Sequence, residues 1–370
     1  MKIQSPQIAL QHETAQLSAL ITTEDGCDRL WYAVDRAYGD FLTVERLDAF
    51  LVGMLLLAMQ RGENIYVEGP ISEKLFYNLT QSLIKILTLL LPSLRPIKII
   101  PEALVNDPCE TAGGVATGFS GGIDSFSVLA DHFWGDVSDS YRVTHLIFNN
   151  VGSHGHGGRP LFHQRYERLW QFAQDYELPF VKIDSNLDNW LRDLEFRTTH
   201  TTRNASAVLA LQKLFGKYLY ASAHKYQNCF IGEAKDGSVI DPTALHLLST
   251  ETIDCISTGC QYSRVEKTIQ VADLAPSYRY LDVCVHAIDK AENCSTCWKC
   301  ARTLLTLEIL GKQTLYQHVF DLEKFSTIRA NYIASLDHNP EPLEQEVIDL
   351  AVQCGYSLSP IDSRNFLQPY

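Results

Sequence analysis

The segment from Ser120 to Ser125 reads Ser-Gly-Gly-Ile-Asp-Ser and has the composition of an anion-binding turn. It lies between a short apolar run that ends at Phe119 and a run with helical spacing. Glycines let a backbone approach a ligand closely, and the N–H groups at a helix start favour negative charge. The segment therefore predicts a phosphate-binding loop with Asp124 in the first turn of a helix. It lacks the lysine of the GxxxxGK[ST] loop and the GxGxxG spacing of dinucleotide-binding folds.

Four cysteines form the second group of residues whose types and spacing could do chemistry. Cys294, Cys297 and Cys300 are each separated by two residues, and nine residues lie between Cys284 and the first of them. Four thiolates at such spacing can surround one tetrahedral ion, and a closed four-sulfur shell is typical of structural zinc. An iron–sulfur cluster is the alternative, because cysteines spaced by two residues also bind such clusters.

These residues need elements to position them, and from about residue 112 strand-like and helix-like segments alternate. This rhythm predicts a parallel sheet covered by helices on both faces, an α/β fold. Ligands of such sheets bind outside the carboxyl ends of the strands. Phe119 and the pair Phe148 and Asn149 end two of these strands. The predicted strands are 115–119, 143–149, 180–183 and 218–221. The predicted helices are one that follows the glycine loop and runs to about 133, and two more over 160–176 and 201–215.

Three parts of the chain are expected from these patterns. The pattern of residues 1–110 predicts a separate N-terminal α+β domain, in which no group of residues indicates catalysis or metal binding. Residues 111–311 carry the glycine loop and the four cysteines. Residues 312–370 predict a helical C-terminal extension, in which 339–355 has a proline and acidic residues where a helix would start.

The loop, directly after an apolar strand, resembles the signature of the PP-loop (N-type) ATP pyrophosphatases. The segment 112–311 is similar to the 7-cyano-7-deazaguanine synthase family in four features, in order. These are the loop 120–125, the Arg203-Asn204 pair in a helix, the basic segment with Arg264 and Lys267, and the cysteine motif. The resemblance implies that the enzyme, with ATP and Mg²⁺, adenylates a carboxylate or amide oxygen and releases pyrophosphate. A nitrogen nucleophile then displaces AMP, and zinc is held by the cysteines.

The resemblance also implies the roles of individual residues. Catalysis is expected to use Asp124, Ser125, Arg264 and Lys267. The expected ATP contacts are Phe119, Ser120, Gly121, Gly122, Asp124, Ser125, Phe148, Asn149, Arg203 and Asn204. The expected zinc ligands are Cys284, Cys294, Cys297 and Cys300. Substrate contacts are expected from position rather than from the resemblance: His154 and His156 lie in a glycine-rich loop at the predicted ligand edge of the sheet, and His224 follows the fourth strand. Glu233 and Asp236 could orient an amine or a metal, or lie in a solvated turn.

Composition limits the classes of partner that we expect for this protein. The formal net charge of −13 disfavours a sequence-independent grip on nucleic acid. No apolar stretch is long enough to span a membrane, and the N-terminus lacks the apolar core of a signal peptide. We therefore expect a cytoplasmic enzyme, a possible homodimer, that acts on a small molecule. Two alternatives stay open: a tRNA sulfurtransferase that uses Cys255 and Cys260, and an ATP-binding regulatory protein without turnover.

Overall fold

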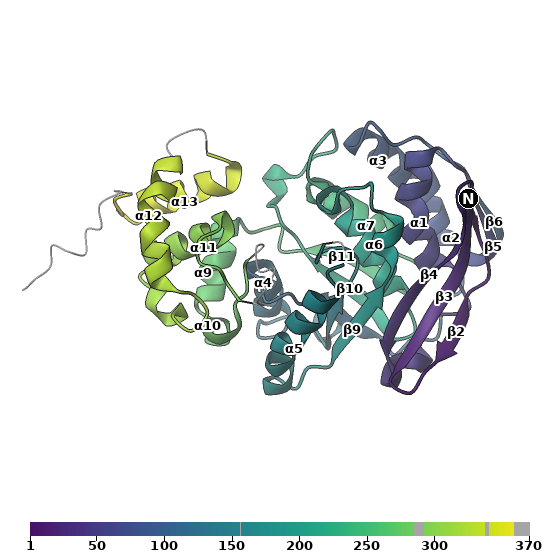
Figure 1. Ribbon diagram of the computed structural model, residues 1–370, viewed down its shortest axis with the longest axis horizontal. Coiled ribbons are helices and arrows are strands. Elements are labelled where there is room, and N and C mark those ends of the chain that lie inside the picture. The colour runs from purple at the N-terminus through teal and green to yellow at the C-terminus, as the bar shows by residue number, and fades with distance from the viewer. Residues whose placement is uncertain (156, 285–291, 337–339, 359–370) are drawn as a thin grey trace, which may run out of the picture. The chain divides into compact units, whose positions relative to one another are not determined.

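The computed structural model describes residues 1–155, 157–284, 292–336 and 340–358 (Figure 1). The chain folds into two compact units. The first comprises Met1–Phe119 and Asp136–Cys260, and the second comprises Ser120–Gly135 and Gln261–Tyr370. The glycine loop and the cysteine motif, far apart in the sequence, therefore belong to the same unit.

The first unit is built on one mixed sheet, whose strand order is β11-β10-β7-β8-β9-β4-β3-β1-β5-β6, with β2 beside β3 (Figure 1). The strands are β1 Lys2–Ile3, β2 Gln7–Leu10, β3 Thr14–Thr23, β4 Gly26–Asp35, β5 Ile65–Ser72, β6 Ile99–Val105, β7 Gly114–Gly118, β8 His145–Asn149, β9 Phe180–Ser185, β10 Phe215–Ala221 and β11 Asp254–Thr258.

The flank from β11 to β9 is parallel throughout, as the alternation of strands and helices predicts. Its central strands are apolar and buried: Leu146 and Ile147 of β8 and Val181 of β9 are at most 1% exposed. Such strands suit a sheet covered on both faces. Helices α5 (Arg159–Asp175) and α7 (Phe196–Leu209) connect these strands.

The strands of the first 110 residues join the same sheet. β4 pairs antiparallel with β9 through Tyr32–Ser185 and Ala33–Asp184. Asn186 extends this junction: its side-chain oxygen accepts from the Trp31 N–H (2.9 Å), and its amide donates to the Arg29 carbonyl (2.8 Å). The mixed sheet is thus parallel on its flanks and antiparallel in the middle.

The predicted boundary at residue 110 therefore differs from the division into units. Hydrogen bonds between β4 and β9 make residues 1–110 continuous with the parallel strands. Helix α1 (Asp48–Arg61) packs on α7, and nearly all of its side chains are buried. It ends at Gly62, whose φ of 71° is the left-handed conformation that glycine adopts without strain. The other α-helices among the described residues of this unit are α2 Glu73–Asn78, α3 Ile84–Leu90, α6 Leu187–Trp190 and α8 Asp241–Leu247.

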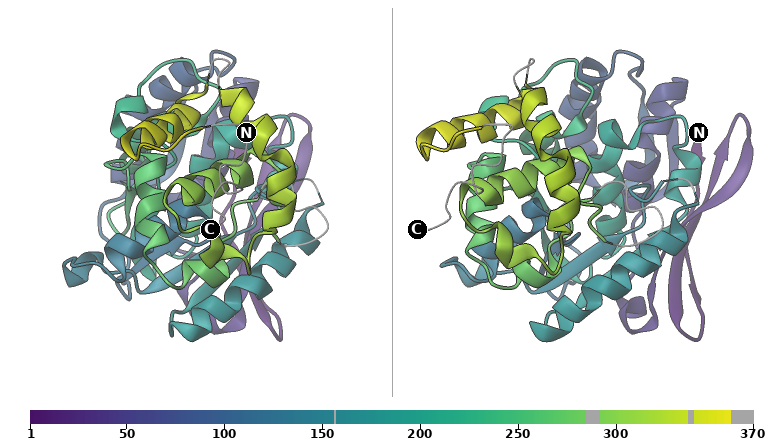
Figure 2. Two further views of the ribbon diagram at one scale, coloured as in Figure 1. Left: turned by 90° about the vertical axis from the view of Figure 1, so that its left-hand side faces the viewer. Right: turned by 60° about the vertical axis from the view of Figure 1, so that its left-hand side comes forward.

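The second unit is helical, and Figure 2 shows its C-terminal helices in green and yellow. Helix α4 packs on α9, and α11 contacts α9, α12 and α13. The predicted C-terminal helix is present as α13. The helices are α4 Ile123–His132, α9 Arg264–Ala272, α10 Ser277–Tyr280, α11 Trp298–Ile309, α12 Leu322–Leu336 and α13 Pro342–Gln353. In the described part of the chain, no helix is both long and apolar enough to span a membrane.

Candidate functional site

The loop 120–125 opens α4, as its composition predicts. Gly121 has a φ of 75°, in the left-handed region where a side chain would be strained. Its carbonyl accepts a hydrogen bond from the N–H of Asp282 (2.8 Å), which fixes the turn. Gly122 is the N-cap of α4, and its carbonyl accepts from the Ser125 hydroxyl (2.9 Å). The side chain of Ser125 is therefore engaged in holding the loop, while Ser120 is exposed.

Asp124 is held by two cations from α9. Its Oδ2 lies 2.8 Å from Nη2 of Arg264, and its Oδ1 lies 3.2 Å from Nζ of Lys267. Burial alone would raise the pKa of Asp124, but the charges of Arg264 and Lys267 outweigh it and hold that pKa below its usual range. The three residues proposed from two separate motifs thus meet at one point of the second unit.

Helix α9 is anchored at its start. Ser263 and Glu266 form a capping box, with Ser263 Oγ accepting from the Glu266 N–H (3.1 Å). Glu346 of α13 accepts from the N–H of Arg264 (2.8 Å). Lys267 is 1% exposed, so its ammonium group is fixed within the helical unit. The C-terminal extension therefore helps to position the basic segment.

Two further cations near Asp124 were not predicted as site residues. Lys299 and Arg302 of α11 interact electrostatically with both Asp124 and Arg264. Burial, and then the charge of Arg264, lower the pKa of Lys299 and lower that of Arg302 to about 10. Because both residues lie beside the cysteine motif, their sequence position alone suggested a metal site rather than an anion site.

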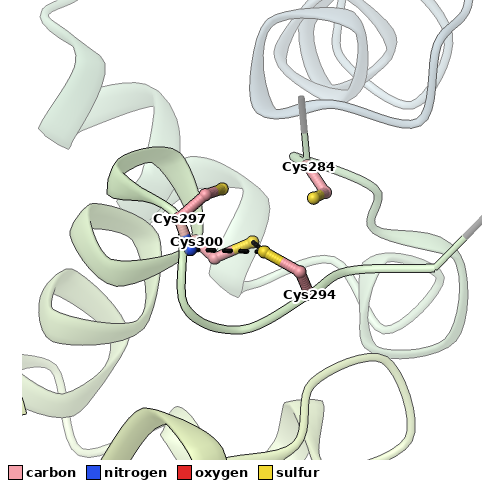
Figure 3. A group of neighbouring side chains, drawn as sticks. All are labelled: Cys284, Cys294, Cys297 and Cys300. Atoms are coloured by element: carbon pink, nitrogen blue, oxygen red, sulfur yellow. Dashed lines mark hydrogen bonds between the residues drawn. The ribbon is translucent and has the colours of Figure 1, made fainter. Parts of the chain in front are cut away.

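The four cysteines come together as predicted (Figure 3). Their sulfur atoms all lie within 4.8 Å of one another, and Cys294 and Cys300 are 4.0 Å apart. Zinc–sulfur bonds of about 2.3 Å in a tetrahedron place the sulfurs about 3.8 Å apart, so the arrangement fits zinc. Cys297 is the N-cap of α11, and its N–H donates to the sulfur of Cys294 (3.2 Å).

Asn293 ties the two cysteine-bearing segments together. Its side-chain oxygen accepts from the N–H of Val283 (2.8 Å), and its amide donates to the Leu281 and Val319 carbonyls (2.9 and 3.0 Å). Cys284 is thereby held beside Cys294 through protein contacts. No spacing rule indicates this role, because the partners are backbone atoms brought close only by the fold.

In the first unit, Asn149 and Asn204 face each other. Nδ2 of Asn149 donates to Oδ1 of Asn204 (3.0 Å), whose own amide donates to the His200 carbonyl (2.8 Å). Oδ1 of Asn149 is buried with no hydrogen-bond partner among the described residues. Phe119 and Phe148 are packed in the aromatic core, stacked on Phe172 and Phe162 respectively. A nucleotide could therefore meet the backbone at these two positions rather than the rings.

Arg203 is 1% exposed, and its guanidinium is surrounded by protein acceptors. Nε donates to Thr199 (2.8 Å), and Nη1 donates to the Val151 carbonyl (3.1 Å) and to Asp188 (2.9 Å). Nη2 donates to two more carbonyls, of Leu191 and Leu194. All five N–H donors of a guanidinium are thus used. We assign Arg203 a structural role, and it plays no part in the ATP contacts proposed below.

Of the histidines, His154 packs edge-on against Phe148 and Phe162, and burial lowers its pKa to about 4. It is therefore a neutral imidazole at physiological pH. His156 lies outside the described residues. His224 follows β10 and approaches Asp236, which accepts from Ser238 instead of lying in a solvated turn.

Cys255 and Cys260 are both buried free thiols. Burial raises the pKa of Cys255 to about 12, which disfavours the thiolate that sulfur transfer requires.

Comparison with known proteins gives no family for this chain. No protein-family model, no curated protein and no solved structure matches it.

Proposed function

We propose that this protein is an ATP pyrophosphatase of the PP-loop class that activates a small substrate as an adenylate and joins it to a nitrogen nucleophile. The observation that carries the proposal is the glycine loop 120–125 opening α4, with Arg264 and Lys267 converging on Asp124. This arrangement agrees with the resemblance to the 7-cyano-7-deazaguanine synthases, whose motifs contribute the same residues.

In this proposal the loop receives the β- and γ-phosphates of ATP. The N–H groups at the start of α4 donate to phosphate oxygens, and Arg264 and Lys267 supply charge. An oxygen of the substrate attacks the α-phosphorus, and pyrophosphate leaves. Positive charge fixed in place before the reaction stabilises the charge that develops on this leaving group. Lys299 and Arg302 add to the same field.

Mg²⁺ would neutralise phosphate charge when it is bound with ATP. Magnesium beside phosphates uses one or two carboxylates and several waters. Asp124 is the one carboxylate in the segment 120–125 and fits this role. Both of its oxygens already face cations, so we expect Asp124 also to keep Arg264 and Lys267 in position.

We expect the substrate to be a small acid or amide. A net charge of −13 gives no general attraction for a polyanion such as tRNA. The tRNA sulfurtransferase alternative also needs a reactive thiol, and Cys255 is fully buried. An ATP-binding regulatory protein would use the same cations to hold the phosphates, so the measurement of AMP formation separates it from an enzyme.

The experiment measures nucleotide products. With ATP, Mg²⁺ and pooled small metabolites, we expect AMP and pyrophosphate. Asp124→Asn should lower AMP formation by about a hundredfold, because it releases two cations from the site. The matched control is Asp139→Asn, which removes a carboxylate that is fully exposed.

ADP as the stoichiometric product would rule out the proposal. Stimulation by bulk tRNA but not by metabolites would favour the sulfurtransferase. ATP binding without AMP formation across the pool would favour the regulatory protein.

A further inference from the structure

A polar cluster in the first unit, around Asp236, is not used by the proposed ATP chemistry. Nε2 of His200 lies 3.7 Å from Oδ1 of Asp236, and Nε2 of His224 lies 3.8 Å from Oδ2. Nδ1 of His200 contacts the hydroxyl of Tyr220 at 2.6 Å. Tyr220 and His224 lie at the carboxyl end of β10, the edge where parallel sheets bind ligands.

Asp236 is fixed in this cluster. Its carboxylate accepts from the N–H and the hydroxyl of Ser238 (3.0 and 2.5 Å) and from Nε of Arg197 (3.1 Å). Contacts with His200, His224 and Ser238 outweigh the effect of burial and hold the pKa of Asp236 far below its usual range. It is therefore a permanent negative charge beside two imidazoles.

Asp241 is a second, deeper carboxylate of the cluster and is completely buried. Its Oδ1 accepts from the hydroxyl of Thr201 (2.5 Å), the residue after His200. Its Oδ2 is buried without a hydrogen-bond partner in the described ranges. Asp241 interacts electrostatically with His200, His224 and Asp236, so the four side chains form one group.

His224 is the second side chain with unused hydrogen-bonding capacity. Both of its ring nitrogens are buried, and within the part of the chain that the structure describes neither has a partner at hydrogen-bond distance, the carboxylate of Asp236 being 3.8 Å from Nε2. Buried polar groups in native proteins normally find partners, because leaving them unsatisfied is destabilising. The missing partner should donate hydrogen bonds, since the unsatisfied atom of Asp241 only accepts them when ionised.

Charge then selects the kind of partner. Asp236 and Asp241 bring two carboxylates, whereas Arg197, the cation paired with Asp236, is 66% exposed. A positively charged donor suits such a site better than water or an anion. The loop that carries His224 also exposes Phe230 and Ile231, which offer apolar surface to the organic part of a ligand.

We infer that Asp241, Asp236 and His224 bind the ammonium group of a small amine or ammonia, and that His224 takes a proton from it. This inference rests on the proposed function, in which this amine is the nitrogen nucleophile. Nδ1 or Nε2 of His224 accepts the first proton from the ammonium group, which leaves a lone pair on the amine nitrogen. This lone pair forms the C–N bond while the C–O bond of the adenylate breaks. The electron pair of the broken C–O bond leaves on the phosphate oxygen of AMP. The nitrogen then loses its second proton to solvent.

Binding is tested on the full chain without any knowledge of the substrate. Protein with ¹⁵N-labelled histidine rings is titrated with ammonium chloride and methylammonium chloride, and with potassium chloride at matched ionic strength. We expect saturable shifts of the His224 and His200 signals with both ammonium salts and not with potassium. Asp241→Asn should abolish these shifts, while the exposed control Asp254→Asn should keep them.

No saturable shift, equal shifts with potassium, or an unchanged response in Asp241→Asn would overturn the ammonium site. The proton transfer is tested separately once turnover is measured. His224→Gln should keep pyrophosphate release, lose about a hundredfold in product formation with ammonium, and recover with hydroxylamine. Hydroxylamine needs no base because it is largely unprotonated at neutral pH.

Equal loss of pyrophosphate release and product, or no rescue by hydroxylamine, would overturn the role of His224. A failure of the proposed function looks different. In that case the wild-type chain releases no pyrophosphate with any metabolite, while the ammonium titration still gives its saturable shifts.

Discussion

At the scale of single residues, Asp241 is an acidic side chain at a buried position, where its ionised form is unfavourable. It is fully buried, and burial raises its pKa to about 6. In an unfolded chain the pKa of an aspartate is about 3.9. Ionisation of this side chain therefore lowers the free energy of unfolding. The loss is absent below about pH 4, grows between about pH 4 and pH 6, and is constant above about pH 6. A buried carboxylate with this cost to stability points to function.

We predict that Asp241→Asn stabilises the protein above pH 6, in buffer free of ammonium. Two pKa units correspond to at most about 3 kcal/mol, and we expect about 1–3 kcal/mol. The asparagine oxygen can still accept from Thr201. The free energy of unfolding is measured by urea denaturation at pH 7 and near pH 4, where the gain should vanish.

Asp254→Asn, which removes an exposed carboxylate, is the control and should show no such pH dependence. Lower stability of Asp241→Asn at every pH would mean that the carboxylate is needed for hydrogen bonding alone.

The residues of the glycine loop could be predicted from the sequence, but those of the amine site could not. Asp124, Arg264 and Lys267 lie in motifs whose local composition already indicates anion binding. Asp241 and His224 carry no such pattern, because their partners come from α7 and from a loop that is irregular in sequence. Burial decides the chemistry of Asp241, and burial is a property of the fold.

At the scale of elements, helix α11 links two kinds of chemistry. Cys297 caps its start, Cys300 lies in its first turn, and Lys299 and Arg302 interact electrostatically with Asp124. A metal held by the cysteines would therefore fix the helix that carries two cations. We expect the cysteine centre to stabilise the second unit and to affect catalysis only through it.

We predict about one zinc per chain, measured by elemental analysis of protein purified without chelators. Cys300→Ser should abolish zinc retention and lower the melting temperature, because structural zinc contributes about 10–16 kcal/mol of apparent binding free energy in small peptides. Cys354→Ser is the matched control, since Cys354 is an exposed thiol. Iron, sulfide and visible absorbance in the wild type would instead show an iron–sulfur cluster.

Element boundaries followed the sequence where the hydrophobic pattern was clear. The strand predicted at 143–149 is β8 His145–Asn149, and the helix predicted at 160–176 is α5 Arg159–Asp175. Helix α7 begins at Phe196, whereas the predicted start is 201. The prediction misses the first residues of the helix because they are rich in threonine and lack apolar spacing. Strand β11 was not predicted, since its sequence Asp-Cys-Ile-Ser-Thr is short and polar.

At the scale of the whole molecule, the continuous sheet of the first unit decides how the chain can be divided. Pairing between β4 and β9 joins residues about 150 apart in sequence, and a contact of this kind leaves no local pattern. The sequence alone therefore predicted a separate N-terminal domain. Tyr32 of β4 is buried, and its hydroxyl donates to Ser206 of α7 (3.1 Å), which joins the two halves again through the core.

We predict that a chain beginning at residue 111 does not fold on its own. It would expose the edge of β9 and the face of α7 that α1 covers, and such apolar surfaces and unpaired strand edges promote aggregation. Co-expression of residues 1–110 with residues 111–370 should instead give a soluble complex, because the two fragments can restore the β4–β9 pairing. Solubility and cooperative unfolding of each sample, followed by circular dichroism, provide the measurement.

As a control, Tyr32→Ala in the first fragment should weaken the complex, whereas Tyr66→Ala, at a half-exposed position on β5, should not. If residues 111–370 alone are soluble and unfold cooperatively, the junction between β4 and β9 contributes little to the folding of the parallel strands.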